Sequence, residues 1–275
     1  MLRPPYTSYN RLHVYHLDNP AIPCPDDQDL IGLWVEDDTS VLFFHQPKDL
    51  LVADLCSRSG CSLIYQAELD YQDWEAGQEI TAFTVADITV APVWETDTAD
   101  IRLDPSVIFG TGFHPTTRIC LHTLLTMLRS PETRINSVLD LGTGTGLLAI
   151  AAALYGARQV TAIDNNPLAC QVAKANCRRN RVGKQVSVQQ LDLRQHIPST
   201  KEYNLVIANL YRGLLETLFI TPSFWEADYY LLSGFLPGME GDLLAAIPGD
   251  RVRFLNRLRS DKWCIWQLAN RRING

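Results

Sequence analysis

Residues 138–146 read VLDLGTGTG, in which a short, mostly apolar run leads directly into alternating glycines. The run predicts a buried strand, and the apolar pattern of residues 147–154 predicts that a helix begins at once. Glycine tolerates positive φ and lets a ligand approach the backbone, and free amides at a helix start can face an anionic group. The alternative is a strand-to-helix turn that binds nothing, because short glycine motifs need their structural context.

Short apolar runs alternate with helical runs on both sides of this turn. The predicted strands are 138–141, 159–163, 186–191, 205–208, 229–233, 252–256 and 263–268, and the predicted helices include 147–154 and 167–180. Strands separated by helices predict a parallel sheet with right-handed crossovers. The short connection between the last two strands predicts that the final strand is antiparallel. The sequence therefore predicts an α/β fold with a seven-stranded Rossmann-like sheet.

The first part of the chain has a different pattern and predicts a small α+β domain over residues 1–69. Its strand-like runs are 11–17, 30–35, 40–45 and 61–67, with a short helix over 47–57. Residues 70–98 have mixed character and turn residues, which favours a linker. We expect residues 99–275 to form the larger domain.

The composition excludes several classes of protein. With 275 residues, 46% of them hydrophobic, the chain can bury a large core and is not a disordered protein. A net charge of −7 argues against direct nucleic-acid binding, which needs a basic surface. No apolar run has the length of a membrane span or signal peptide, so we expect a cytoplasmic protein without membrane contact. Seven cysteines without a CxxC pair favour a reduced chain and no metal site.

A carboxylate ends the second strand of the predicted sheet. Asp164 lies 22 positions after Gly142, and an acid at this point can accept hydrogen bonds from both hydroxyls of a ribose. Alternatively, Asp164 caps the helix that Pro167 begins, a role that Asn165 or Asn166 could equally fill. The glycine loop and the acid together predict a nucleoside-containing cofactor.

A second glycine-containing run, FGTGFHPTT, covers residues 109–117. Pro115 is typical of the first turn of a helix, so Thr116 and Thr117 would lie where hydroxyls and free amides can meet a carboxylate. Their alternative role is helix capping. His114 has no visible acid partner, and we favour a packing or loop-ordering role for it over that of a catalytic base.

A third run, LVIANLY over residues 205–211, places Asn209 at the carboxyl end of the fourth strand, where open α/β folds bind ligands. Asn209 could offer its amide to a cofactor or its carbonyl to a substrate amine, or it could cap the next helix. Tyr211 and Phe113 could line an acceptor channel or belong to the core. Asp192, after the third strand, could contact an adenine or be a solvated loop acid.

The glycine spacing resembles motif I of S-adenosylmethionine-dependent methyltransferases, and the three runs together resemble the PrmA family, which methylates a protein of the large ribosomal subunit. The family's loop reads approximately FGTGTHPTT, as residues 109–117 nearly do. Its motif I resembles DxGCGSGILAI, against DLGTGTGLLAI at 140–150. Its VANIL corresponds to IANLY at 207–211. The resemblance covers roughly residues 70–275.

The resemblance implies a methyltransferase that uses S-adenosylmethionine and methylates lysine or α-amino groups, first of all on a ribosomal protein. Carried over by position, it implies that the cofactor is bound by Thr117, Gly142, Gly144, Asp164 and Asn209. It also implies that the small N-terminal domain recognises the protein substrate. No general base is assigned, because the sulfonium methyl is already activated. A methyltransferase of another protein or of a small molecule, and a catalytically inactive partner-binding module, stay open as alternatives.

Overall fold

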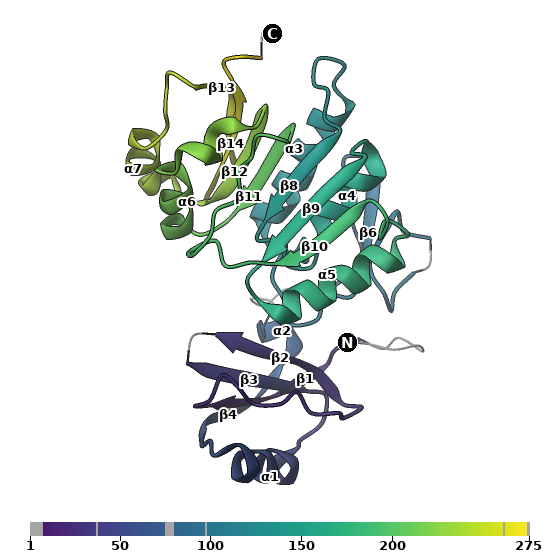
Figure 1. Cartoon of the computed structure of the whole chain (residues 1–275). Coiled ribbons are helices and arrows are strands. Elements are labelled where there is room, and N and C mark those ends of the chain that lie inside the picture. Colours follow the sequence, from purple (N-terminus) through teal and green to yellow (C-terminus); the bar gives the residue numbers. More distant parts are fainter. Residues whose placement is uncertain (1–7, 37, 75–79, 97, 261, 274–275) are drawn as a thin grey trace.

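The computed structural model describes residues 8–36, 38–74, 80–96, 98–260 and 262–273. Its strands form a four-stranded, a three-stranded and a seven-stranded sheet. Figure 1 shows the four-stranded sheet with helix α1 (Asp49–Ser59) at one end of the molecule and the seven-stranded sheet with its helices at the other. In the part of the chain that the structure describes, no helix is long and apolar enough to span a bilayer.

The seven-stranded sheet has the strand order β10-β9-β8-β11-β12-β14-β13. All pairs from β10 to β12 are parallel, whereas β14 runs antiparallel to both β12 and β13. The strands are β8 (Ser137–Leu141), β9 (Gln159–Asp164), β10 (Val186–Gln190), β11 (Leu205–Asn209), β12 (Tyr229–Phe235), β13 (Val252–Ser260) and β14 (Trp263–Asn270). The predicted α/β class and the final antiparallel strand are confirmed, and each predicted run overlaps one of these strands.

The direction of the chain across the sheet reverses beside β8. The chain passes from β8 to β9 and β10 on one side and then crosses to β11 on the other. In open α/β sheets the crevice at such a reversal, outside the carboxyl ends of the strands, is where ligands bind. The glycine loop, Asp164 and Asn209 all lie at this point, because they end β8, β9 and β11.

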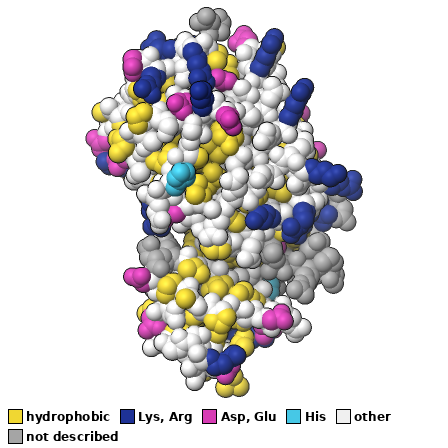
Figure 2. Space-filling view, viewed as in Figure 1, with side chains coloured by type: hydrophobic (Ala, Val, Ile, Leu, Met, Phe, Trp, Pro, Cys, Tyr) yellow, Lys and Arg dark blue, Asp and Glu magenta, His cyan; other side chains and the backbone are white. Residues whose placement is uncertain are grey.

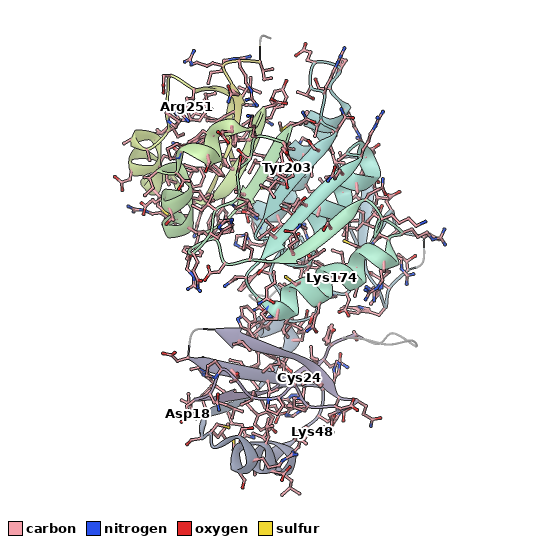
Figure 3. The ribbon with its side chains drawn as sticks, viewed as in Figure 1. Asp18, Cys24, Lys48, Lys174, Tyr203 and Arg251 are labelled. Atoms are coloured by element: carbon pink, nitrogen blue, oxygen red, sulfur yellow. The ribbon has the colours of Figure 1, made fainter. Side chains whose placement is uncertain are left out.

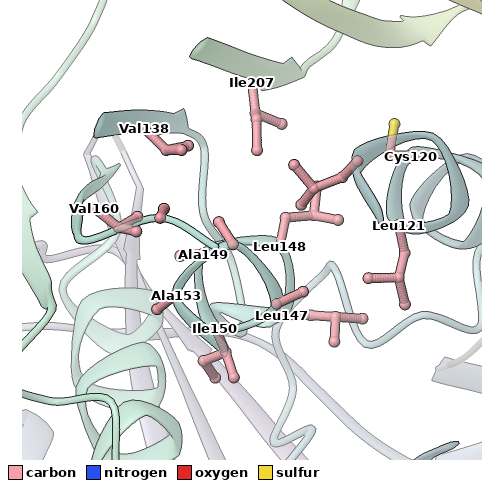
Figure 4. Close-up of a cluster of buried hydrophobic side chains, with 14 of the residues drawn as sticks. Cys120, Leu121, Val138, Leu147, Leu148, Ala149, Ile150, Ala153, Val160 and Ile207 are labelled. Atoms are coloured by element: carbon pink, nitrogen blue, oxygen red, sulfur yellow. The ribbon is translucent and has the colours of Figure 1, made fainter. Parts of the chain in front are cut away.

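Helices cover both faces of the large sheet and bury two hydrophobic cores. They are α3 (Pro115–Arg129), α4 (Leu147–Tyr155), α5 (Pro167–Arg179), α6 (Arg212–Phe219), α7 (Glu240–Ala245) and the 3-10 turns η1 (Pro222–Glu226) and η2 (Pro237–Met239). One core lies under α3 and α4, and Figure 4 shows Leu148 of α4 near Val138 and Ile207 of the sheet. The other core lies under α6, η1 and α7. Because α4 is apolar on every side, it is buried along nearly its whole length.

The four-stranded sheet is antiparallel, with the order β2-β3-β1-β4. Its strands are β1 (Arg11–Leu17), β2 (Leu30–Glu36), β3 (Thr39–Phe44) and β4 (Leu63–Asp70). Helix α1 covers one face and buries Val52 and Leu55 against it. Lys48, labelled in Figure 3, forms ion pairs of 3.0 and 2.7 Å with Asp27 and Asp29, which ties the loop before β2 to the start of α1.

The other face of the small sheet is buried against the larger part of the molecule. Leu12, Ile31 and Phe43 from the sheet share a core with Leu168 and Val172 of α5. A Cβ atom on Gly32 of β2 would lie 2.5 Å from a methyl carbon of the Leu168 side chain, so this contact depends on a glycine. The small sheet is therefore seated directly beside α5, the helix that follows Asp164.

The region between the two large sheets contains secondary structure that the sequence pattern did not predict. It holds α2 (Tyr71–Trp74) and the strands β5 (Phe83–Val85), β6 (Ile88–Pro92) and β7 (Ile101–Leu103), which form the three-stranded sheet. Val85, Ile88 and Val90 belong to the same core as α3 and α4. Residues 83–92 are thus attached to the larger part of the molecule by apolar packing.

Candidate functional site

A cavity of about 540 Å³ opens at the carboxyl ends of β8, β9 and β11. This volume falls within the range of small-molecule sites. The wall contains all five residues that the resemblance implied for the cofactor, Thr117, Gly142, Gly144, Asp164 and Asn209. Residues far apart in the sequence therefore meet at the reversal point of the sheet.

The glycine loop is held in one conformation that other residues would not tolerate. Gly142, Gly144 and Gly146 have φ values of 71°, 55° and 86°. A Cβ atom on Gly144 would lie only 2.3 Å from the carbonyl oxygen of Phe109. The amides of Gly142 and Thr143 donate to the carbonyl oxygen of Ile163, at 2.8 and 2.9 Å. The loop is therefore fixed against both β9 and residues 109–110.

Asp140 supports the loop from below without lining the cavity. It is buried, and the Thr143 hydroxyl donates to its Oδ2 at 2.6 Å. Burial raises the pKa of Asp140 to about 6; the bond from Thr143 lowers it and the charge of Asp164 raises it. The role of Asp140 is thus to hold Thr143 and the turn that follows.

Asp164 joins the glycine loop to the start of α5. Its Oδ2 accepts from the Gly144 amide and its Oδ1 from the Asn166 amide, each at 3.0 Å. Burial raises the pKa of Asp164, and the backbone amides that donate to it act in the opposite direction. Asn166 caps α5, because its side chain accepts from the Leu168 amide. Capping is therefore not the role of Asp164, whose carboxylate lies in the cavity wall.

The start of α3 forms another part of the cavity wall. His114 is the N-cap residue, and its Nδ1 lies 2.7 Å from Thr116 Oγ1 and 3.3 Å from the Thr116 amide nitrogen. Asn209 Nδ2 donates to the same Thr116 Oγ1 at 3.3 Å. Thr117 is 3% exposed and also lines the cavity. His114 is thus connected to Asn209 of β11 by hydrogen bonds through Thr116, which agrees with a loop-ordering role.

Of the two residues that could line an acceptor channel, only Tyr211 reaches the cavity. Tyr211 lines the cavity and is 61% exposed. Phe113 is buried against Phe83 and Arg118 and lies outside the cavity wall, so it belongs to the core. Asp192 lines the cavity, where hydrogen bonds from Arg194 lower its pKa.

Sequence reasoning missed the aromatic side chains that complete the wall. Trp34 reaches the cavity from β2 of the small sheet, and Trp263 reaches it from the start of β14. Trp34 also contacts Phe109 edge to face, with ring centroids 6.3 Å apart. No motif marks Trp34 as a site residue, because its position depends on how the small sheet docks on α5.

The comparisons with known proteins match this architecture. The family model described as ribosomal protein L11 methyltransferase (PrmA) matches residues 23–271. The chain belongs to the PrmA family. A ribosomal protein L11 methyltransferase of Streptococcus equi subsp. zooepidemicus is 36% identical over 180 residues, which cover 62% of this chain and 54% of that protein. One from Chloroflexus aurantiacus is 53% identical over 88 residues, 32% of this chain and 26% of that protein.

The match to these PrmA relatives is partial in length. The chain spans about half the length of the curated relatives that it matches. Among solved structures, a ribosomal protein L11 methylase from Lactobacillus delbrueckii subsp. bulgaricus superposes with a TM-score of 0.59 at 22% identity. That match covers 69% of this chain and 98% of the other, and it supports the fold.

Potential metal ligands of this PrmA family member were compared over the residues that the structure describes. Within residues 8–273, masked positions excepted, no group of three or more His, Cys, Asp or Glu side chains is arranged to hold a metal ion. The seven cysteines, which the structure describes in full, are free thiols.

Proposed function

We propose that this chain is an S-adenosylmethionine-dependent protein N-methyltransferase that acts on lysine or α-amino groups, and that its substrate is ribosomal protein L11. The observation that carries the proposal is the composition of the cavity. A glycine loop with positive φ, the carboxylate of Asp164 and the amide of Asn209 all meet there. Membership of the PrmA family supports the choice of substrate.

The residues of the cavity suit S-adenosylmethionine. Asp164 can accept from ribose hydroxyls, because carboxylate oxygens accept more than one hydrogen bond and its side chain lies in the wall. Asp192 also lines the cavity and would contact the adenine. Gly142 and Gly144 let the ligand approach the loop backbone. Thr117 and the start of α3 would face the carboxylate of the methionine part.

The protein's own residues would align the acceptor and exclude water. When bound, the cofactor supplies an activated methyl group on a positively charged sulfur. The acceptor amine must be neutral, and its nitrogen lone pair must point along the methyl–sulfur bond. The Asn209 carbonyl would accept a hydrogen bond from the amine and set that direction. Trp34, Phe109 and Trp263 line the cavity and would keep water out.

We propose that residues 1–69 recognise the protein substrate, that residues 70–98 are the linker and that residues 99–275 are the methyltransferase domain of a cytoplasmic enzyme. Figure 2 shows hydrophobic side chains on the surface formed by the four-stranded sheet. Leu63, Ile64 and Tyr65 of its edge strand β4 are each at least 44% exposed. An exposed apolar surface of this kind suits a protein partner better than a small solute.

The cofactor assignment can be tested by calorimetry with S-adenosylmethionine. Asp164→Ala should weaken binding by roughly tenfold or more, because hydrogen bonds to a charged group contribute about 1.5–3 kcal/mol. Asp87→Ala is the matched control, since Asp87 is an exposed acid paired with Arg129 away from the cavity. Equal affinity in wild type and Asp164→Ala would exclude the proposed cofactor site.

The substrate assignment needs a separate experiment. Methyl-labelled cofactor is incubated with the protein and a lysate from cells that lack the gene, and the label is traced. Label in ribosomal protein L11 supports the proposal, and mass spectrometry then identifies the residue and the number of methyl groups. Label in another protein or in small solutes would contradict the assignment of ribosomal protein L11 as the substrate. If no label is transferred, the result would favour a partner-binding module.

A further inference from the structure

Three hydrogen bonds connect His114, Thr116 and Asn209 at the cavity wall. Thr116 Oγ1 is 2.7 Å from His114 Nδ1 and 3.3 Å from Asn209 Nδ2. The Thr116 amide also donates to His114 Nδ1, at 3.3 Å. The connection therefore runs from the N-cap of α3, through the first turn of that helix, to the carboxyl end of β11.

The positions of the protons in this connection follow from the donors and acceptors. His114 Nδ1 accepts the Thr116 N–H, so Nδ1 carries no proton and the ring is the neutral Nε2–H form. The Thr116 hydroxyl has a single hydrogen, which it donates to Nδ1. Its oxygen can then only accept from Asn209, so the side chain of Asn209 must present its NH₂ group to Thr116.

The same argument determines the direction of the Asn209 side-chain carbonyl. With Nδ2 directed at Thr116, the carbonyl Oδ1 is on the opposite side of the amide, and it has no hydrogen bond within the part of the chain that the structure describes. Asn209 lines the cavity. An acceptor is therefore available there to a ligand N–H.

We propose that His114 is a positioning residue that keeps the Asn209 carbonyl directed at the substrate amine, acting through Thr116. This inference rests on the proposed methyl transfer and names the groups that orient its acceptor. Protonation of His114 would reverse the donor and acceptor roles along these hydrogen bonds. The Nδ1–H then donates to Thr116 Oγ1, the hydroxyl hydrogen is released toward Asn209, and the amide turns so that its NH₂ faces the amine.

The surroundings of His114 favour the neutral ring. Trp263 of β14 contacts it edge to face, with ring centroids 4.9 Å apart. Burial lowers the pKa of His114, and a cation at a helix N-terminus is unfavourable. Arg118, one turn later on α3, donates to the Gly112 carbonyl. Among the described residues, no acidic side chain raises the pKa of His114 in opposition to burial.

The first test is the tautomer of His114, which does not depend on enzyme activity. Two-bond ¹⁵N–¹H correlation spectra of the ¹⁵N-histidine-labelled protein at pH 8 identify which ring nitrogen carries the proton, and the His114→Asn variant assigns the signal. We expect the Nε2–H form. A protonated Nδ1 at pH 8 would overturn the proposal whether or not the protein is a methyltransferase.

The second test compares two replacements that keep different parts of the imidazole. Asn places its Oδ1 near the position of Nδ1 and can accept from both Thr116 groups, whereas Gln places its oxygen nearer to Nε2. We expect the kcat for methylation of ribosomal protein L11 at pH 8 to fall at least tenfold in His114→Gln and less than threefold in His114→Asn. The cofactor Kd should change little in either, and His122→Asn on the exposed side of α3 is the control.

The pH profile of kcat/KM separates positioning from a merely structural role. In wild type, log kcat/KM should rise by two per pH unit below the His114 pKa and by one above it, because the amine and the histidine must both be neutral. His114→Asn should show a slope of one throughout. Equal slopes in the two proteins, or equal losses in the Asn and Gln variants, would overturn the proposal. If wild type transfers no methyl group, the proposed function fails, and the NMR test still decides on His114.

Discussion

Replacement of Glu240 by Gln should destabilise the protein by an amount that depends on pH. Glu240 begins α7, and its side chain is 7% exposed. Its carboxylate accepts from Arg257 at 2.9 Å, from Arg259 at 2.5 Å and from Trp266 Nε1 at 2.9 Å. These bonds join α7 to the antiparallel strands β13 and β14. Gln keeps the shape of the side chain but loses the charge and one acceptor oxygen.

The size of the effect follows from the pKa of the carboxyl group. Burial alone would raise the pKa of Glu240, but the bonds from Arg257, Trp266 and Arg259 lower it from 4.5 to about 2. A shift of this size corresponds to about 3 kcal/mol at neutral pH. The side chains of Arg257 and Arg259 are 44% and 62% exposed, so solvent screens part of the interaction. We expect a net loss of about 2 kcal/mol.

The sign of the pH dependence is fixed by the direction of the shift. Because the pKa of Glu240 is lower in the folded state, its stabilisation is complete above the unfolded value of about 4.5. It is lost as the pH falls toward 2, and less than half of it should remain at pH 3. The difference in unfolding free energy between wild type and variant should therefore shrink on acidification.

Urea unfolding at pH 7 and pH 3, followed by tryptophan fluorescence, measures this difference. Glu216→Gln is the control, because Glu216 forms a surface pair with Arg212 in which both side chains are about 40% exposed. That control should cost about 0.5 kcal/mol or less. The reasoning is refuted if Glu240→Gln costs no more than the control, or if its cost is the same at both pH values.

Three shorter predictions concern the cavity and the side chains that support it. Gly144→Ala should weaken S-adenosylmethionine binding at least tenfold in calorimetry, because its Cβ would meet the Phe109 carbonyl; Gly60→Ala, at φ 63° with no atom within 4 Å, should leave that affinity unchanged. The pKa of Asp140 is raised to about 6, so the stability contributed by its neutral form is lost as the pH rises from about 4 through 6; a ¹³C-carboxyl titration with a midpoint near 4 would contradict this. Trp34→Ala should increase the cofactor dissociation rate roughly fivefold in stopped-flow measurements, and an unchanged rate would exclude Trp34 from the site.

The large sheet was predictable because its strands are buried on both faces. Such strands read as continuous apolar runs, and the glycine loop after β8 gave the register of the motifs around it. Asp164 and Asn209 were assigned to strand ends from the same pattern. Chain order then placed them at one edge of the sheet, and the structure brings them to one cavity.

Features that depend on tertiary packing were not predictable in this way. The β5–β6 hairpin is short and turns at Ala86, a non-glycine residue with φ 55°, so the usual turn signal is missing. A helix after Asn209 was predicted only through the alternative in which Asn209 caps it, and the N-cap of α6 is instead Tyr211. The sequence pattern gave no reason to prefer Phe113 or Tyr211 as the residue that lines an acceptor channel. The packing of Phe83 on Phe113, which makes Phe113 a core residue, depends on the tertiary structure.

The contribution of Trp34 to the cavity wall has an evolutionary consequence. The small sheet supplies part of the wall of the cavity that Asp164 and the glycine loop also line. A lineage that exchanged residues 1–69 to acquire a new protein substrate would at the same time replace one wall of this cavity. If the proposed functions hold, changes in β2 that suit a new partner would also alter the cofactor site, and selection would act on both properties at once.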